Sequence, residues 1–330
     1  MSQSYIIIHR GELCKRYLNE GIPDRCATRN LDWGISVPIK GYEDKKIYGW
    51  FENVWGYISA SKYYCEKNNI DWSSFWKDEN CISYFIHAKD NIPFHTIILP
   101  SLLLATKENY NLPNYIISDE YITINGNKLS KSNGNYITAD YLLDNYNVDF
   151  IRYYFLINNP EKKDFNFTWI DFKNSINSNL IGKWGNFINR TLKFINKDFH
   201  GSFKNSIVDI EIENVLKKYF DEVSELISKG EIKTALSNIF DLINYSSKYF
   251  DENKPWILVK EDTEKCQKIL YNCTNLIYNI NTLLKPFIPS SCDIVESYLN
   301  LENNSYIYKS ISKIDINSNI EALYTRIDNI

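Results

Sequence analysis

The spacing of apolar residues changes character between the first and second parts of the chain. In the first part, short apolar runs with the length of buried strands alternate with segments of helical spacing. The predicted strands are Ile47–Phe51, Ile82–Ile86 and Tyr121–Ile124, and the predicted helices are 10–20 and Ile92–Thr106. Strands that alternate with helices predict an α/β fold built on a parallel sheet.

From about residue 138 the apolar spacing is helical almost throughout. The predicted helices are Asp140–Tyr146, Val148–Ile157, 170–197, 210–229, 231–250 and 263–285. Amphipathic helices joined by short loops predict a helical bundle. We therefore expect three parts: an α/β part over 1–137, a connecting helical segment over 138–165, and an all-α bundle over 166–330.

Composition narrows the class of protein. The 330 residues are 44% hydrophobic and 15% aromatic, which is enough for packed cores, and no apolar run of about 18 residues predicts a membrane helix. The seven cysteines include no C-x-x-C pair, so we expect no structural zinc site. Unpaired cysteines without a secretion signal favour the cytoplasm.

The net charge of −4 gives no global attraction to nucleic acid. Any RNA contact must come from a local basic stripe. One candidate consists of Lys183, Arg190, Lys193 and Lys197. The alternative is an ordinary solvated helix face.

The run Lys128-Leu129-Ser130-Lys131-Ser132 follows the polar turn Asn125-Gly126-Asn127. Such a loop allows two ammonium groups and several backbone N–H groups to approach a polyphosphate, although five residues alone also fit a solvated lysine loop. The run resembles the K-M-S-K-S signature of class I aminoacyl-tRNA synthetases. Together, residues 28–57, 89–95 and 121–135 resemble the second half of a methionyl-tRNA synthetase catalytic domain. The resemblance thus implies a partial Rossmann-type sheet followed by an anticodon-binding bundle.

The resemblance implies an ATP site that also uses Mg²⁺. Lys128 and Lys131 would stabilise the charge that builds on the phosphates when a carboxylate attacks ATP, and Ser130 lies between them. Asp90 would accept the ribose hydroxyls; read without the resemblance it would cap a helix from residue 91 onward, and the two roles are compatible. The family has glycine where this chain has Ala88. Ile122 would present its backbone to adenine, although its side chain alone would be assigned to the core.

The amino-acid pocket that the resemblance implies consists of Trp50, Asn53, Tyr57 and His95. Aromatic walls suit the thioether of methionine, which is bound by dispersion and sulfur–aromatic contacts. Asn53 departs from the small apolar residue that is usual in the family, and bulky Trp55 is also unusual. Without the resemblance, Trp50 and Tyr57 would be assigned to the core.

The bundle resembles the family's anticodon-binding domain, with Asn186, Arg190 and Trp256 at the anticodon-reading positions. Asn186 and Arg190 lie four apart on one helical face, and Trp256 could stack on an unpaired base. The partner implied is tRNA(Met). Read without the resemblance, the first two could be a solvated pair and Trp256 a packing wedge beside Pro255.

The family's H-I-G-H signature is absent, since His9, His87, His95 and His200 are too far apart to form it. Ligands bind a doubly wound sheet where its two halves meet, so the missing half should leave an exposed strand edge. Our leading interpretation is a methionine–tRNA ligase, or close paralogue, that needs a separate N-terminal half. The alternatives are a non-catalytic tRNA-binding protein derived from this family and an inert remnant.

Overall fold

A computed structural model of the chain describes residues 7–8, 15, 19–22, 24–203, 207–301, 305–311 and 314–328. It contains two compact units, Met1–Tyr121 and Ile122–Ile330. Most of the helix predicted over 10–20 lies outside the described residues. The loop that contains Lys128 and Lys131, here called the lysine loop, belongs to the second unit, which also contains the helical bundle.

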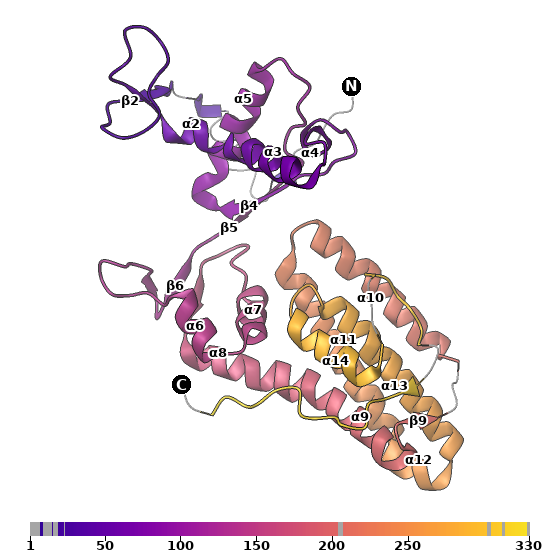
Figure 1. The fold of residues 1–330 in the computed structure, drawn as a ribbon. Helices are drawn as coiled ribbons and strands as arrows, with labels where there is room; N and C mark the ends of the chain where they lie inside the picture. Colours follow the sequence, from indigo (N-terminus) through magenta and orange to yellow (C-terminus); the bar gives the residue numbers. More distant parts are fainter. Residues whose placement is uncertain are drawn as a thin grey trace. The chain divides into compact units, whose positions relative to one another are not determined.

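A small parallel sheet lies at one edge of the first unit (Figure 1). Its described strands are β1 (Ile7–Ile8), β5 (Tyr115–Asp119) and β4 (Tyr84–Ala88), in that order. In the register of β4 against β5, Tyr84 pairs with Tyr115 and Ala88 with Asp119, so both strands end at the same edge. The strand predicted over Ile82–Ile86 is confirmed as β4.

The first unit also contains short helices and a hairpin. The helices are α2 (Gly49–Asn53), α3 (Gly56–Asn68), α4 (Ser73–Trp76), the 3₁₀ turn η1 (Lys89–Asn91), the π-helix η2 (Phe94–Ile98) and α5 (Leu99–Ala105). The antiparallel hairpin consists of β2 (Thr28–Arg29) and β3 (Lys46–Ile47). The small core is formed by Val54, Ile58, Trp76, Phe94, Leu99 and Leu103. The helix predicted over Ile92–Thr106 is confirmed, with a π-helical first part.

The strand predicted over Ile47–Phe51 is wrong. Strand β3 ends at Ile47 and pairs antiparallel with β2, and the chain then turns at Tyr48 into α2. A short apolar run fits either a strand or one helical turn, because it is too short for its periodicity to separate the two. The consequence for the site is that Trp50 and Asn53 lie on a helix.

The second unit begins with a small sheet beside two short helices. Its strands are β6 (Ile122–Ile124), β7 (Asn127–Lys128) and β8 (Phe165–Phe167), with β6 central, parallel to β8 and antiparallel to β7. The helices are α6 (Ala139–Asn145) and α7 (Val148–Ile157). The predicted strand Tyr121–Ile124 and both predicted helices are therefore confirmed, with ends shifted by at most one residue.

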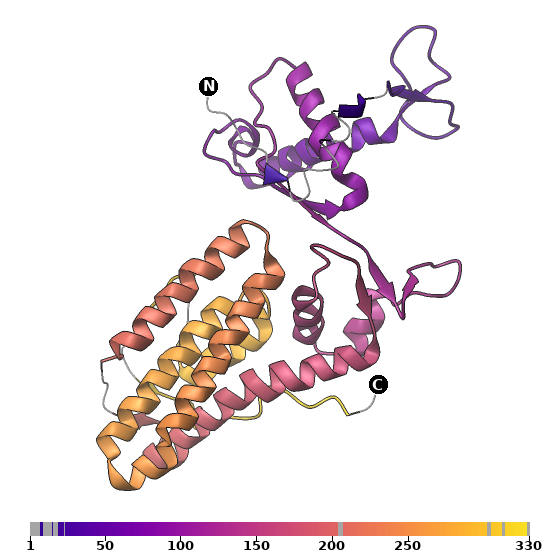
Figure 2. The same cartoon turned by 180° about the vertical axis from the view of Figure 1, so that it is seen from behind.

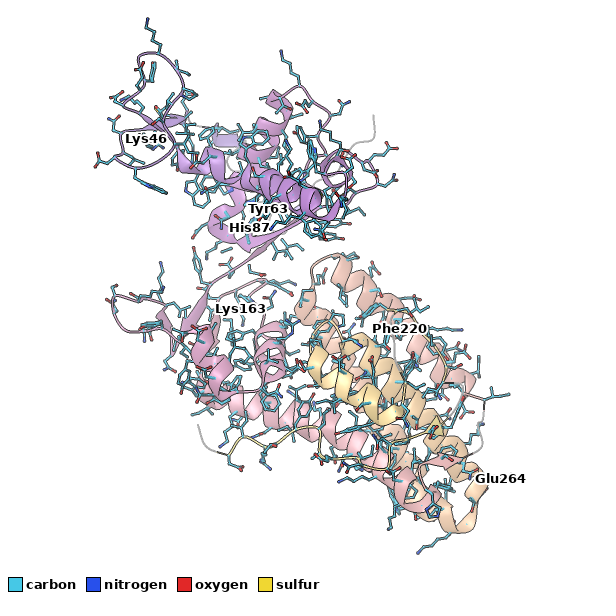
Figure 3. All side chains as sticks on the ribbon, viewed as in Figure 1. Lys46, Tyr63, His87, Lys163, Phe220 and Glu264 are labelled. Atoms are coloured by element: carbon cyan, nitrogen blue, oxygen red, sulfur yellow. The ribbon has the colours of Figure 1, made fainter. Side chains whose placement is uncertain are left out.

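A long continuous helix then leads into the bundle (Figures 1 and 2). It consists of α8 (Trp169–Ser175), the π-helix η3 (Ile176–Gly185) and α9 (Asn186–Phe199). The remaining helices are α10 (Ile210–Ser228), α11 (Ile232–Asn253), α12 (Pro255–Glu261), α13 (Thr263–Leu284) and α14 (Pro289–Leu299). Each of the four long helices predicted here is confirmed. Figure 3 labels Glu264 at one end of the bundle, in the first turn of α13 just after α12.

Helix α13 is the centre of the bundle, because every residue from Ile269 to Leu284 is buried. Buried amides must find hydrogen-bond partners. Asn275 Oδ1 accepts the backbone N–H of Ile311 at 2.8 Å. Asn279 Oδ1 accepts the N–H of Lys309 at 3.1 Å, and its Nδ2 donates to the Lys309 carbonyl at 2.8 Å. These amides hold the segment after α14, which continues alongside the long helix and pairs with β9 (Ser202–Phe203) through β10 (Ile314–Asp315).

Candidate functional site

Two residues of the predicted amino-acid pocket contact each other directly. His95 lies in η2, where its Nδ1 is 2.9 Å from the Asn91 carbonyl. A carbonyl oxygen only accepts, so Nδ1 carries the proton and Nε2 is the acceptor. The Tyr57 hydroxyl of α3 is 2.8 Å from Nε2 and therefore donates to it. Burial lowers the pKa of His95, which agrees with this neutral form.

Trp50 joins this group through Phe94, the neighbour of His95. The Trp50 and Phe94 rings are stacked, with centroids 4.1 Å apart and planes 13° apart. Beside them lies an open cavity of about 260 Å³, lined by Phe51, Pro93, Ile97, Ile98 and Leu102, with Ile22, Asp24, Arg25 and Ser101. Asn53, at the end of α2, is exposed. The structure thus brings Tyr57 to His95, and Trp50 to Phe94, a residue that the sequence analysis missed.

His87 is a second residue that the sequence analysis missed. Its ring is stacked on His95, with centroids 4.3 Å apart and planes 26° apart. Its Nδ1 donates to the Ala88 carbonyl at 3.0 Å, and its buried Nε2 has no hydrogen-bond partner among the described residues. Burial lowers its pKa. Figure 3 labels His87 on β4. In the sequence, the only signal for a role of His87 was its position two residues after Phe85, which places both side chains on one face of the strand.

Asp90 lies where the chain leaves the carboxyl end of β4. This edge is the usual position of a ligand in an α/β sheet. The carboxylate is exposed and accepts a hydrogen bond from the Tyr121 hydroxyl. The preceding residue, Lys89, forms an ion pair with Glu120. The N-cap of η1 is Ala88, so the carboxylate of Asp90 contacts a tyrosine and does not cap this turn.

The lysine loop is held by a tight hairpin. Asn125 and Gly126 both have positive φ, 50° and 78°, as a two-residue turn between twisted strands requires. Ser130 and Asn135 close the loop with two backbone hydrogen bonds, of 2.9 and 3.1 Å. The loop surrounds a polar hollow of about 560 Å³ lined by Asn127, Lys128, Leu129, Ser130, Asn133 and Asn135.

The side chains of Lys128 and Lys131 are exposed on this loop, and Ser130 is half-buried. The Ser130 hydroxyl lies 3.0 Å from that of Ser132. Ile122 is half-buried on β6, in the same unit. The arrangement provides two cations and hydroxyl groups on a short, closed loop, which is the chemistry that phosphate groups require.

Two of the three predicted anticodon residues meet at one ring in the bundle. The guanidinium carbon of Arg190 lies 4.7 Å from the Phe250 ring centroid, and its NH2 group pairs with Asp251. The Trp256 ring lies 6.1 Å from the same ring, at 41° to it. Trp256 is 45% exposed, so part of its face is open. Asn186 is exposed one helical turn before Arg190 on α9.

The described residues also bear on the presence of a metal site, a disulfide and a membrane helix. Within them, no three His, Cys, Asp or Glu side chains are grouped as a metal ion would require. The described cysteines, Cys26, Cys65, Cys81, Cys266, Cys273 and Cys292, are free thiols. None of the described helices has the length and apolar character needed to cross a membrane.

Comparison with known proteins assigns the family. Residues 8–192 match the family described as tRNA synthetases class I (M), and residues 204–323 match the anticodon binding domain of methionyl tRNA ligase. The chain belongs to the methionyl branch of the class I tRNA synthetases. This family membership confirms the fold class, a partial Rossmann-type α/β part followed by an anticodon-binding helical bundle.

Among its relatives in this family, methionine–tRNA ligase 1 of Alkaliphilus oremlandii is 42% identical over 314 residues, and a methionine–tRNA ligase of Bacillus mycoides is 41% identical over 319. These alignments cover 95% and 96% of the chain but only 58% of each relative. The crystal structure of Mycobacterium tuberculosis methionyl-tRNA synthetase bound by methionyl-adenylate has a similar fold, with a TM-score of 0.82 at 20% identity. That match covers 97% of the chain and 64% of the other protein.

Proposed function

We propose that this chain takes part in the ATP-dependent ligation of methionine to tRNA(Met). The observation that carries the proposal is the lysine loop, a closed hairpin loop with Lys128 and Lys131 exposed beside a polar hollow. In the reaction the methionine carboxylate attacks the α-phosphorus of ATP, and pyrophosphate leaves. Fixed cations beside the phosphates would stabilise the charge that builds there. Mg²⁺ would arrive with the ATP phosphates, which are its preferred ligands.

In the nucleotide site, Asp90 would accept the ribose hydroxyls and the backbone at Ile122 would face adenine. Ala88, two residues before Asp90, adds a methyl group where the family has glycine. In the amino-acid site, Trp50 and Tyr57 would form aromatic walls around a thioether. Both ring nitrogens of His95 are engaged by Asn91 and Tyr57, which leaves that ring to act by packing. An aromatic pocket wall that packs against the ligand without forming further hydrogen bonds suits the thioether of methionine.

We propose that the anticodon of tRNA(Met) is read by Asn186, Arg190 and Trp256. The half-exposed Trp256 ring would stack on a base, and Arg190 would contribute hydrogen bonds from a position held by Phe250 and Asp251. Lys183 and Lys193 would contact phosphates. Free thiols at the described cysteines favour the cytoplasm as the place of this reaction.

A further polypeptide would complete the first unit. Ile82, Tyr84 and Ile86 alternate along the β4 segment and are 60%, 43% and 67% exposed. Parallel sheets are normally covered on both faces, and β4 lies at the edge of the described sheet. The relatives are considerably longer than the region matched here. We therefore propose that a separate N-terminal half of the synthetase fold covers this surface, which we call the β4 face.

Methionine-dependent exchange between ATP and pyrophosphate tests the proposal. The chain alone should give no exchange, and the chain mixed with an N-terminal half from a relative should give exchange that needs Lys131. Strong exchange by the chain alone would contradict the need for a second half. Failure of every mixture to exchange, with tRNA binding intact, would instead favour a tRNA-binding protein without catalysis.

A further inference from the structure

The ends of β4 and β5 are joined by side chains beyond the last strand pair. Ala88 and Asp119 are the last register partners. One residue further along, Lys89 pairs with Glu120. One residue beyond that, the Tyr121 hydroxyl donates to the Asp90 carboxylate. Successive residues of the two chain segments therefore remain paired through their side chains after the backbone ladder has ended.

Lys89 also strengthens the hydrogen bond between Tyr121 and Asp90. Lys89 Nζ lies 4.4 Å from the centroid of the Tyr121 ring, and its partner Glu120 has a side chain only 8% exposed. A cation over an aromatic face is attracted to the ring. It also draws electron density from the phenol, which makes the hydroxyl a better donor. Glu120 thus fixes Lys89, Lys89 fixes the Tyr121 ring, and the ring brings its hydroxyl to Asp90.

An exposed carboxylate on a short 3₁₀ turn has several rotamers open to it. A hydrogen bond from a neutral donor to an ionised acceptor is stronger than one between neutral groups, and it selects one of these rotamers. The carboxylate keeps further acceptor positions after Tyr121 has taken one. The contact consequently orients Asp90 without using up its capacity to bind.

We infer that Tyr121 is a positioning residue that holds the Asp90 carboxylate ready for the ribose hydroxyls of a bound nucleotide. The inference rests on the proposed role of Asp90 in binding ATP. Tyr121 itself would touch Asp90 and not the nucleotide. Its contribution should therefore appear only with ligands that carry the hydroxyls that Asp90 accepts.

The test compares the binding of ATP and 2′,3′-dideoxy-ATP to the chain mixed with the complementing N-terminal half of a relative. Wild type should prefer ATP, and Tyr121→Phe, which keeps the ring and its contact with Lys89, should reduce this preference roughly fivefold, the factor for one hydrogen bond. Tyr63→Phe, at a 61% exposed tyrosine of α3, is the matched control and should keep the preference. Asp90→Asn should remove it.

A double-mutant comparison separates positioning from a general structural effect. In an Asp90→Asn background, Tyr121→Phe should cause no further loss of the preference, because the group it positions has gone. A general structural effect would lower the affinity for both nucleotides equally. If wild type prefers ATP and Tyr121→Phe keeps that preference, the role of Tyr121 is overturned while that of Asp90 stands. If wild type binds both nucleotides equally or neither, both roles are overturned.

Discussion

The Tyr57 hydroxyl donates to Nε2 of His95 across 2.8 Å, and this bond requires the His95 ring to be neutral. The opposite nitrogen donates to Asn91, so protonation of the ring would place a second proton where the tyrosine proton now points. His87, stacked on the same ring, is also held in a neutral form by burial. The predicted amino-acid pocket therefore has a defined charge state.

The first prediction follows from the lowered pKa values of His87 and His95. The unfolded chain takes up these protons near the ordinary pKa of 6.5, whereas the folded chain does so only at lower pH. The free energy of unfolding should be unaffected by these groups above 6.5 and should fall as the pH decreases below it. Urea denaturation of the first unit, followed by tryptophan fluorescence, measures this free energy of unfolding. The measurement should cover about pH 5 to 8, where histidines titrate.

His95→Gln should flatten that pH dependence, because one of the two titrating rings is removed. The matched control is His200→Asn, at an exposed helix end where φ is 52° and asparagine is well tolerated. An unchanged slope in His95→Gln would mean that His95 is not held neutral.

The second prediction concerns the lysine loop. In a mixture that contains the complementing half, Lys131→Ala should raise the activation barrier for pyrophosphate exchange by about 2–4 kcal/mol, as for loss of a preorganised charge stabiliser. Since Lys131 is exposed, the melting temperature should not change. Lys163→Ala, at another exposed lysine of the same unit, should leave the rate near that of wild type. Equal rate losses in the two variants would argue for a general charge effect.

The third prediction concerns Trp256 and RNA. Trp256→Ala should weaken binding of tRNA(Met) by roughly 1–3 kcal/mol, the range for one stacking platform, and binding should weaken as salt increases. A tRNA with an unrelated anticodon should be barely affected. Filter binding of both RNAs at two salt concentrations measures the difference. Equal losses for both RNAs, together with a lower melting temperature, would show that Trp256 only packs.

The fourth prediction concerns the β4 face. Ile86→Lys should prevent complementation by the N-terminal half, because a charge would be buried in the new interface without a partner. Leu104→Lys is the matched control, since Leu104 is 65% exposed in the same unit and Ile86 is 67% exposed. Size-exclusion chromatography of the mixtures reports the complex. Loss of the complex in neither variant, or in both alike, would contradict a specific docking surface.

Much of the architecture could be predicted because its signals are local. The helices of the bundle follow from apolar spacing, and the lysine hairpin follows from Asn125 and Gly126, which can adopt positive φ. The strand predicted over Ile47–Phe51 failed because the run is too short to show a period. The partners of the site could not be predicted, since Asp90 and Tyr121, or Tyr57 and His95, meet only through tertiary packing.

The asparagines of α13 have a practical consequence for anyone who excises the helical unit. Asn275 and Asn279 bond to the backbone at Ile311 and Lys309, respectively. Ile311 and Lys309 therefore complete the buried centre of the bundle, although they lie after its last described helix. A fragment cut directly after Leu299 would leave two amides facing an opened groove. Such a fragment should expose surface that is normally buried, and it should aggregate. The smallest version of the helical unit that folds by itself should therefore retain the chain at least through Ile311.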